Sequence, residues 1–188
     1  MASRIKKVVA RNTKRGVKDS SGRVQGPASL ENVIYNKPGY LIRRMHQIAV
    51  SIFLDETKEF DLTPLQYGML ATVRAYPGVD QSTLGKSMGL DRTTVVGIVD
   101  RLERKGWLLR RTVATDRRVR QLYVTPAGLQ HLTDIRSVTD AAQQRMLEPL
   151  SEKERAQFVK YLVKILAHHN DDARVPVKDV MRHAHVNR

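Results

Sequence analysis

The sequence predicts a mainly helical fold with one small β-hairpin. Apolar residues recur about every 3.6 positions over most of residues 36–168, as they do on helices that bury one face. Residues that favour the start of a helix precede most of these segments. The exception is a pair of short runs, 107–113 and 119–125, on either side of a charged turn, which is typical of a hairpin.

Three long helices are predicted outside the central third of the chain. The first begins near Pro38, a residue suited to the first turn of a helix. The second follows Thr125-Pro126 and ends before Pro149, and the third begins at the capping box 151–154. We expect the first helix to bury a broad apolar face, and we expect the polar residues after His169 to be frayed. The stripe of the first helix consists of Leu41, Met45, Ile48 and Ile52.

The central third of the sequence predicts a winged helix-turn-helix. A capping box at 63–66 opens one helix, and Asp80 caps a second helix over residues 81–88. A Gly-Leu turn leads to a third helix, which Asp91 caps and Gly106 ends. The hairpin follows directly. This order of elements is typical of proteins that place the third helix in the major groove of DNA.

Candidate DNA-binding residues lie on the helix that Asp91 caps and on the hairpin. Short hydroxyl side chains near the start of the helix can reach base edges in a groove about 12 Å wide. Arginines at a hairpin tip suit the concentrated negative potential of a narrow minor groove. The candidates are Arg92, Thr93, Thr94, Gly97, Arg101 and Arg104 on the helix, and Arg110, Arg111, Asp116, Arg117, Arg118 and Arg120 on the hairpin.

The sequence predicts more specific roles for two positions on the helix that Asp91 caps. Gly97 costs about 1 kcal/mol inside a helix relative to alanine. Either a close approach of DNA to the backbone or close packing against a neighbouring helix would explain this glycine. Asp100 lies on the same side of the helix and is expected to pair with Arg104, four residues further on.

The charge of the chain favours a polyanionic partner. Its 188 residues include 33 Lys+Arg and 19 Asp+Glu, a formal net charge of +14. Residues 1–30 hold eight cations and one acid, and residues 91–120 hold nine cations and four acids. Cations placed on phosphates release condensed counterions, which drives binding to nucleic acids. We expect residues 1–30 to form a disordered basic arm that adds affinity for DNA independently of sequence.

Composition and local motifs exclude several other functions. There is no cysteine, so disulfides, Cys-ligated zinc and thiol redox sensing are excluded. The longest nearly apolar stretch, 48–54, is far shorter than the roughly 20 residues of a membrane span. The basic N-terminus lacks the apolar region of a signal peptide, so we expect a cytoplasmic protein without membrane contact. No local motif suggests an enzyme, and no metal or other cofactor is expected.

Several motifs together resemble the MarR family of regulators. They are Gly89-Leu90-Asp91, residues 99–106 (VDRLERKG), Asp116-Arg117-Arg118 and residues 122–128 (LYVTPAG), and the order of helices over residues 36–168 agrees. The resemblance implies a MarR-like dimer whose dimerisation helices come from both ends of the chain. It implies that Arg118 enters the minor groove while Asp116 braces the wing. It also implies repression at a palindromic operator, released by a small anion or aromatic acid.

A ligand site is predicted at the start of the first long helix. A guanidinium beside aromatic groups can hold a carboxylate while the ring of the ligand is buried. The segment is similar to that of family members that govern catabolism of aromatic or heteroaromatic carboxylic acids, including the nicotinate-degradation repressor. Candidate ligand residues are Tyr40, Arg43, Arg44 and His46, with Tyr67 and Met69 as further linings that the family resemblance implies. The alternative is that the two arginines form interface ion pairs and that His46 packs in the core.

The predicted organisation has five parts. They are a basic arm (1–30), an N-terminal dimerisation helix (31–62), a DNA-binding lobe (63–125), C-terminal dimerisation helices (126–168) and a polar tail (169–188). The long helices carry more apolar surface than one small lobe needs, which independently favours a dimer. We expect a homodimeric repressor that binds an operator in double-stranded DNA and a small aromatic carboxylate effector. The alternatives are a non-specific architectural DNA-binding protein without a ligand and a winged-helix module that binds other proteins.

Overall fold

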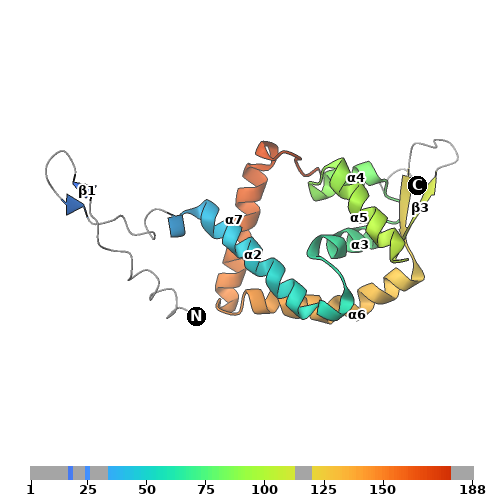
Figure 1. The fold of residues 1–188 in the computed structure, drawn as a ribbon, viewed down its shortest axis with the longest axis horizontal. Helices are drawn as coiled ribbons and strands as arrows, with labels where there is room; N and C mark the ends of the chain where they lie inside the picture. The colour runs from blue at the N-terminus through green and yellow to red at the C-terminus, as the bar shows by residue number, and fades with distance from the viewer. Residues whose placement is uncertain (1–16, 19–23, 26–33, 113–119, 179–188) are drawn as a thin grey trace. The chain divides into compact units, whose positions relative to one another are not determined.

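The computed structural model describes residues 34–112 and 120–178, together with the dipeptides 17–18 and 24–25 (Figure 1). Asp116, Arg117 and Arg118, most of the predicted arm and residues 179–188 lie outside the described residues. The chain divides into two compact units, residues 1–48 and 49–188. In the part of the chain that is described, no helix combines the length and the apolar character needed to span a bilayer.

The first unit contains a short strand pair and the beginning of a helix. β1 (Val17–Lys18) pairs antiparallel with β2 (Val24–Gln25), so that Val17 lies opposite Gln25. No strand was expected here, because two residues per strand are too few to show the alternation that marks a strand in a sequence. α2 (Pro38–Glu56) begins at the predicted proline and continues into the second unit.

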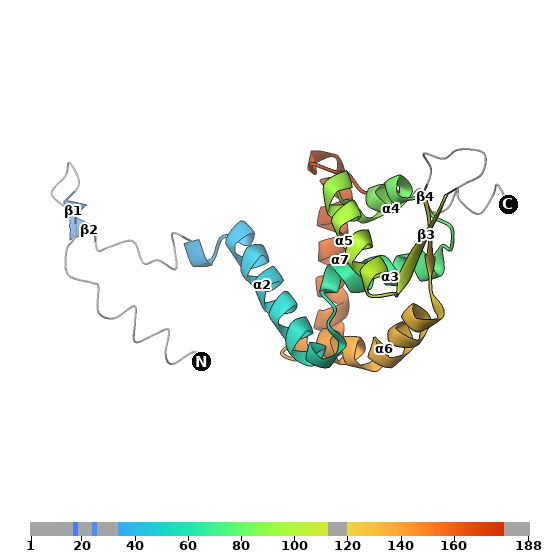
Figure 2. The ribbon, with the colours of Figure 1, turned by 45° about the vertical axis from the view of Figure 1, so that its right-hand side comes forward.

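The second unit contains the predicted winged helix-turn-helix. Its helices are α3 (Pro64–Ala75), α4 (Gln81–Met88) and α5 (Arg92–Arg104), and its hairpin joins β3 (Leu108–Thr112) to β4 (Arg120–Val124). The two strands are antiparallel, with Leu108 opposite Val124 and Thr112 opposite Arg120. Figure 2 shows the hairpin beside α3 and α5. These five elements are named the winged lobe.

Side-chain caps fix the helix starts in the winged lobe. The Thr63 hydroxyl accepts a hydrogen bond from the Gln66 N–H, and the Gln66 side chain accepts one from the Thr63 N–H, both at 3.2 Å. The Asp80 carboxylate accepts hydrogen bonds from the N–H groups of Ser82 and Thr83 at 2.9 and 3.0 Å. Each cap satisfies backbone donors that the first turn of a helix leaves unpaired. The predicted helix starts are therefore confirmed.

One hydrophobic core joins the winged lobe to α6 (Pro126–Met146). Its members that have no exposed surface are Met69, Leu70, Val73, Leu84, Val99, Leu102, Leu122 and Ile135. They come from α3, α4, α5, β4 and α6, so the core fixes the hairpin and the first half of α6 against the three helices. Full burial of one such side chain contributes about 1.5–3 kcal/mol to folding.

An aromatic stack ties the base of the hairpin to α6. The rings of Trp107 and His131 are stacked with centroids 3.9 Å apart, and Phe60 of the 3-10 turn η2 (Lys58–Phe60) meets His131 edge-on at 5.7 Å. A Cβ at Gly128 would lie 2.2 Å from the Trp107 carbonyl oxygen, so only glycine allows this approach. Burial lowers the pKa of His131 below its ordinary value, against the opposing charge of Asp134.

Helix α7 (Glu152–His168) starts where predicted, and its apolar stripe is not buried within the single chain. The Glu154 carboxylate accepts hydrogen bonds from the Ser151 N–H at 2.8 Å and the Ser151 hydroxyl at 2.6 Å. No residue of α7 is buried: Phe158 is half-buried, and Val159, Tyr161 and the apolar residues from Leu162 to Leu166 are 37–69% exposed. On α2, Phe53 alone is buried. The single chain therefore leaves much of each stripe uncovered.

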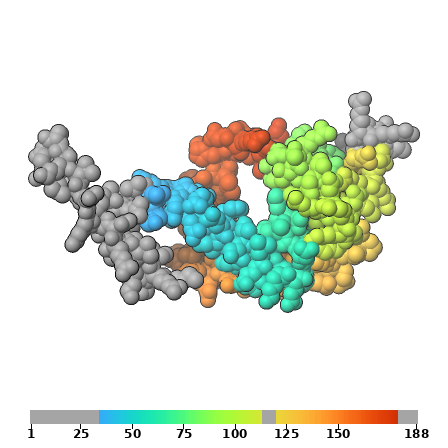
Figure 3. Space-filling model, in the orientation of Figure 1, coloured from blue at the N-terminus to red at the C-terminus, as the bar shows by residue number. Residues whose placement is uncertain are grey.

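The residues after α7 pack onto the winged lobe, so the expectation of a frayed end is wrong for residues 170–178. Asn170 begins the 3-10 turn η3 (Asn170–Asp172), and its side chain exchanges hydrogen bonds of 2.9 and 3.1 Å with the backbone of Val177. The Lys178 N–H donates to the Lys86 carbonyl on α4 at 2.9 Å. Figure 3 shows this segment, in red, passing from α7 to α4. Residues 173–178 are named the C-terminal strap.

Candidate DNA-binding surface and effector segment

The first turn of α5 exposes polar side chains. Asp91 caps the helix, because its carboxylate accepts hydrogen bonds from the Thr94 N–H at 2.9 Å and the Thr94 hydroxyl at 3.1 Å. The backbone hydrogen bond is the main reason that the pKa of Asp91 lies below its usual value. The cap thus engages Thr94, while Arg92 and Thr93 are exposed to solvent.

Gly97 lies on an open side of α5. A Cβ at this position would meet no atom within 4 Å among the described residues outside the backbone of α5 itself. The expectation of close helix packing at this glycine is therefore wrong for the chain taken alone. A close approach of DNA is the explanation that stays open for a residue that costs about 1 kcal/mol in a helix.

Arg110 joins β3 to α5 through an ion-pair network. Its guanidinium pairs with the Asp100 carboxylate, and its Nε lies 3.1 Å from a carboxylate oxygen of Glu103. The side chain is 21% exposed. The predicted Asp100–Arg104 pair is wrong, because Arg104 instead donates from Nε to the Asp100 backbone oxygen at 3.4 Å. The two carboxylates thus hold the Arg110 guanidinium against α5 within the winged lobe.

The other described arginines of the predicted surface are exposed. The guanidinium carbon of Arg111 lies 5.1 Å from the ring centroid of Tyr123, and Arg120 donates to the Thr112 hydroxyl at 3.3 Å. Both positions lie on the hairpin, on opposite strands. Contacts of this kind hold the side chains extended without neutralising their charge. Arg111 and Arg120 are therefore available to phosphates.

Elements α4, α5 and β4 line a groove of about 740 Å³, which we name the helix-turn-helix groove. Its basic side chains are those of Lys86, Arg92 and Arg120. Its acidic side chains are those of Asp80 and Asp91, and both carboxylates accept hydrogen bonds from N–H groups at helix starts. The two carboxylates are thus engaged with the backbone at the helix starts, whereas the three basic side chains line the open groove.

Two contributors to this groove were missed by the sequence analysis. Lys86 is a single lysine on a short helix and carries no distinguishing signal. Val175 of the C-terminal strap also lines the groove. A signal for the strap did exist, because a residue that precedes a proline, as Val175 precedes Pro176, is restricted to extended conformations that suit docking on a surface.

A second cavity, of about 560 Å³, lies at the other end of α5. Arg101, Arg104, Lys105 and Lys58 are among its lining residues. Lys105 pairs with Asp61 at 2.7 Å and lies over the ring of Trp107. Arg101 and Arg104, both predicted to bind DNA, are therefore separated from the groove that Arg92 and Arg120 line.

The predicted effector segment brings two of its candidates together. The guanidinium carbon of Arg43 lies 5.1 Å from the ring centroid of Tyr40, and the ring of Tyr35 lies 5.3 Å from that of Tyr40. A cation over an aromatic face is stabilised by the negative potential of the ring. The start of α2 and the residues just before it thus present an arginine next to two aromatic rings.

The remaining effector candidates have other surroundings. Arg44 donates to the Gln47 side chain at 2.9 Å. His46 is exposed, so the alternative that placed it in the core is wrong for the chain taken alone. Tyr67 is half-buried on α3, and Met69 has no exposed surface. Met69 belongs to the core of the winged lobe, where its position on α3 faces inward.

The fold and the basic first turn of α5 define a winged helix-turn-helix DNA-binding protein. The model of the MarR family matches residues 62–119. A putative transcriptional regulatory protein for the hcr operon of Thauera aromatica is 36% identical over 115 residues, which cover 61% of this chain and 68% of that protein. The chain therefore belongs to the MarR family of transcriptional regulators and is not an enzyme.

Two solved structures illustrate the similarity. The PcaV transcriptional regulator from Streptomyces coelicolor, in complex with its natural ligand, is 30% identical with a TM-score of 0.64, covering 71% of this chain and 94% of PcaV. BpsR from Bordetella bronchiseptica, whose DNA binding is regulated by 6-hydroxynicotinic acid, is 26% identical with a TM-score of 0.66, covering 74% and 97%. The fold class predicted from the sequence is thus confirmed.

Proposed function

We propose that this protein is a homodimeric repressor that binds a palindromic operator and is released by a small aromatic or heteroaromatic carboxylic acid. The observation that carries the proposal is the first turn of α5. Arg92 and Thr93 are exposed there, and Gly97 has open space around it one turn further along the same helix. A helix of this kind can enter the major groove with its backbone close to the bases.

The hairpin is assigned to the adjacent minor groove. The family resemblance gives Arg118 the groove contact, Arg117 a place beside it and Asp116 the role of bracing the wing. Arg111 and Arg120 are exposed and are assigned to flanking phosphates. An inserted arginine gains most where the minor groove is narrow, because the negative potential is concentrated there.

A second copy of the chain is proposed to cover the apolar stripes of α2 and α7. Leu41, Ile42 and Ile48 on α2 are 43–58% exposed. Closed dimers form most simply when one surface meets its own copy across a twofold axis. A twofold axis between two winged lobes requires a palindromic operator with half-sites about one helical turn apart.

The effector is proposed to bind at the start of α2. Arg43 can hold a carboxylate in two parallel hydrogen bonds, and the rings of Tyr40 and Tyr35 can contact an aromatic body. The heteroaromatic acid that regulates BpsR supports this class of ligand. Such an effector releases DNA only by binding the non-operator state more tightly, with a typical coupling of about 1–3 kcal/mol.

The test is a fluorescence-anisotropy titration at ~150 mM salt, where sequence-independent attraction is already reduced. The probe is the intergenic DNA next to the gene for this protein, and a random duplex of equal length is the control. We expect tighter binding to the first duplex and its release by one member of a panel of aromatic acids. Equal binding to both duplexes, unaffected by every acid, would establish the architectural alternative.

Matched variants locate the two sites. Arg118→Ala should weaken operator binding by about 1 kcal/mol or more, as expected for a lost groove contact, whereas Arg136→Ala on α6 should not.

Arg43→Ala should bind DNA normally and lose the response to the acid. Arg44→Ala is its control, since Arg44 is engaged with Gln47. A normal response in Arg43→Ala would remove Arg43 from the effector site.

A further inference from the structure

We propose that the C-terminal strap is a third DNA-contacting element, which presents Arg174 and Lys178 to backbone phosphates beside the start of α5. The inference rests on the proposed function, because it requires a duplex whose major groove α5 enters. The chemistry recognised is that of phosphate diesters, which are read through charge and without reference to base sequence.

The strap is held in place by contacts of its last two residues. Asn170 exchanges two hydrogen bonds with the backbone of Val177, and the Lys178 N–H donates to the Lys86 carbonyl. The Val177 side chain also passes over Gly89, where a Cβ would lie 3.1 Å from the Val177 Cγ2 atom. Gly89 also has a φ of 66°, so this turn needs glycine for its backbone and leaves room for the strap.

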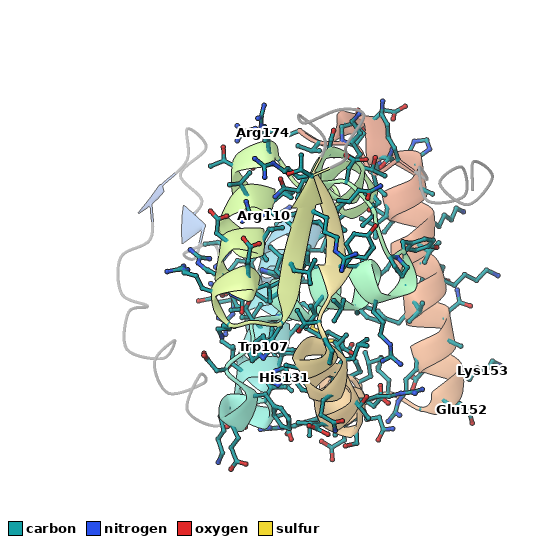
Figure 4. All side chains as sticks on the ribbon, turned by 90° about the vertical axis from the view of Figure 1, so that its right-hand side faces the viewer. Trp107, Arg110, His131, Glu152, Lys153 and Arg174 are labelled. Carbon is teal, nitrogen blue, oxygen red and sulfur yellow. The ribbon has the colours of Figure 1, made fainter. Side chains whose placement is uncertain are left out.

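The strap lies beside the residues that are proposed to meet DNA. Val175 lines the helix-turn-helix groove together with Arg92 and Arg120. After the hydrogen bonds from Thr94, the positive charge of Arg174 also contributes to holding the pKa of Asp91, the capping residue of α5, below its usual value. Figure 4 shows Arg174 at the upper end of the molecule and Lys153, at the start of α7, at the lower end. A duplex seated on the start of α5 would therefore lie next to Arg174.

The charge of this region favours contact with DNA over masking of the groove. Lys86, Arg92 and Arg120 already line the groove, and the strap adds Arg174 and Lys178. On the preceding turn, Asp172 is engaged with His169 at 2.7 Å. Like charges gathered in this way repel one another in the free protein, and a polyanion relieves the repulsion.

The backbone of the strap is also suited to binding. Ala173 begins it in an extended conformation with φ −71° and ψ 143°, and Pro176 fixes its own φ. The two cations are thus held on a short, restricted segment. Less conformational entropy is lost when such a segment binds than when a free tail does.

The main test compares Arg174→Ala/Lys178→Ala with the wild-type protein on the operator duplex over a range of salt concentrations. We expect affinity to fall about tenfold at ~150 mM salt. The slope of log K against log salt should decrease by about 0.9 for each phosphate contact that is lost. Lys153→Ala, which removes an exposed cation at the opposite end, should change neither quantity. Unchanged affinity and slope in the double variant would overturn the inference.

A second variant tests the docking of the strap. Asn170→Ala/Val175→Asn keeps both cations and adds no charge, but it removes the hydrogen bonds between Asn170 and Val177 and the apolar contact of Val175 in the groove, so it should lose affinity to the same degree. Circular dichroism and the mass in solution verify that fold and assembly are intact. A gain in affinity would show that the strap masks the groove and would overturn the proposal. If the wild-type protein itself does not prefer its operator, the proposed function fails instead.

Discussion

The winged lobe and helix α7 are equally well specified locally but pack in opposite ways. Helices α3, in the lobe, and α7 both begin with side chains that cap the first turn, at Thr63 for α3 and at Ser151 with Glu154 for α7. Yet α3 has four buried residues, whereas none of the 17 residues of α7 is buried. Local signals therefore decide where a helix forms, while burial requires a second apolar surface. The lobe supplies that surface to its own helices and not to α7.

The largest effect is expected from charging the stripe of α7. Val163 and Leu166 are 59% and 69% exposed, so Val163→Asp/Leu166→Asp should leave the winged lobe folded while two stripes can no longer meet. We expect monomers and a loss of operator affinity of about 100-fold, on the order of 2.7 kcal/mol. Sedimentation equilibrium and anisotropy measure the two effects. Lys164→Asp, on the polar side of the helix, is the control, and a stable dimer in the double variant would refute the assignment.

Truncating one leucine in each region should separate two kinds of stability. Leu102 has no exposed surface, so Leu102→Ala should lower the free energy of unfolding of the lobe by about 2–5 kcal/mol at any protein concentration. Leu162 is 37% exposed, so Leu162→Ala should weaken assembly alone and make the transition depend more steeply on concentration. Urea unfolding at two protein concentrations distinguishes these outcomes. If the unfolding of the two variants depended on protein concentration in the same way, the proposed difference between the two regions would be wrong.

Two glycines allow a smaller and opposite pair of effects. Gly97→Ala should stabilise the lobe by about 1 kcal/mol and weaken operator binding, because the new methyl group meets only DNA. Gly128→Ala should instead destabilise the protein, because its Cβ would collide with the Trp107 carbonyl. Thermal unfolding and anisotropy of both variants check this. Unaltered operator affinity in Gly97→Ala would argue against a close approach of DNA.

The smallest effect is expected from the pH dependence of the stack at the base of the wing. Burial lowers the pKa of His131 below 6.5, so the unfolded chain takes up this proton first as the pH falls. The contribution of His131 to stability is therefore complete above pH 6.5 and is lost as the pH drops toward the folded pKa. His131→Phe should lose less stability than the wild type between pH 7.5 and 5.5. If urea unfolding showed the same loss of stability for both proteins over this pH range, the predicted contribution of His131 would be wrong.

Much of the fold was predictable because its signals act over a few residues. Asp80, Asp91 and Thr125 each cap the helix that directly follows. Gly106, at a φ of 72°, ends the region of α5 as expected. The motifs that identified the family lie within the same short segments. Arg92 and Thr93 could be recognised as exposed because a capped helix start fixes which residues its first turn displays.

Other features could not be read from neighbouring residues. Asp100 has Arg104 one turn away, and sequence spacing favoured that pair, but the return of the chain at β3 brings Arg110 closer to its carboxylate. His131 and Trp107 stack although 24 positions separate them. The surplus apolar surface of the long helices favoured a partner outside the chain, but it did not show which of their residues the single chain covers.

The sequence by itself determined the elements, their order, the charge of the first turn of α5 and the family. Capping, helical periodicity and the hairpin turn depend on residues only a few positions apart, so they can be read along the chain. Only the tertiary structure decided that Arg110 is paired, that the stripe of α7 stays uncovered and that the C-terminal strap docks at Lys86. These outcomes depend on distances between residues far apart in the chain, which packing of the whole core sets.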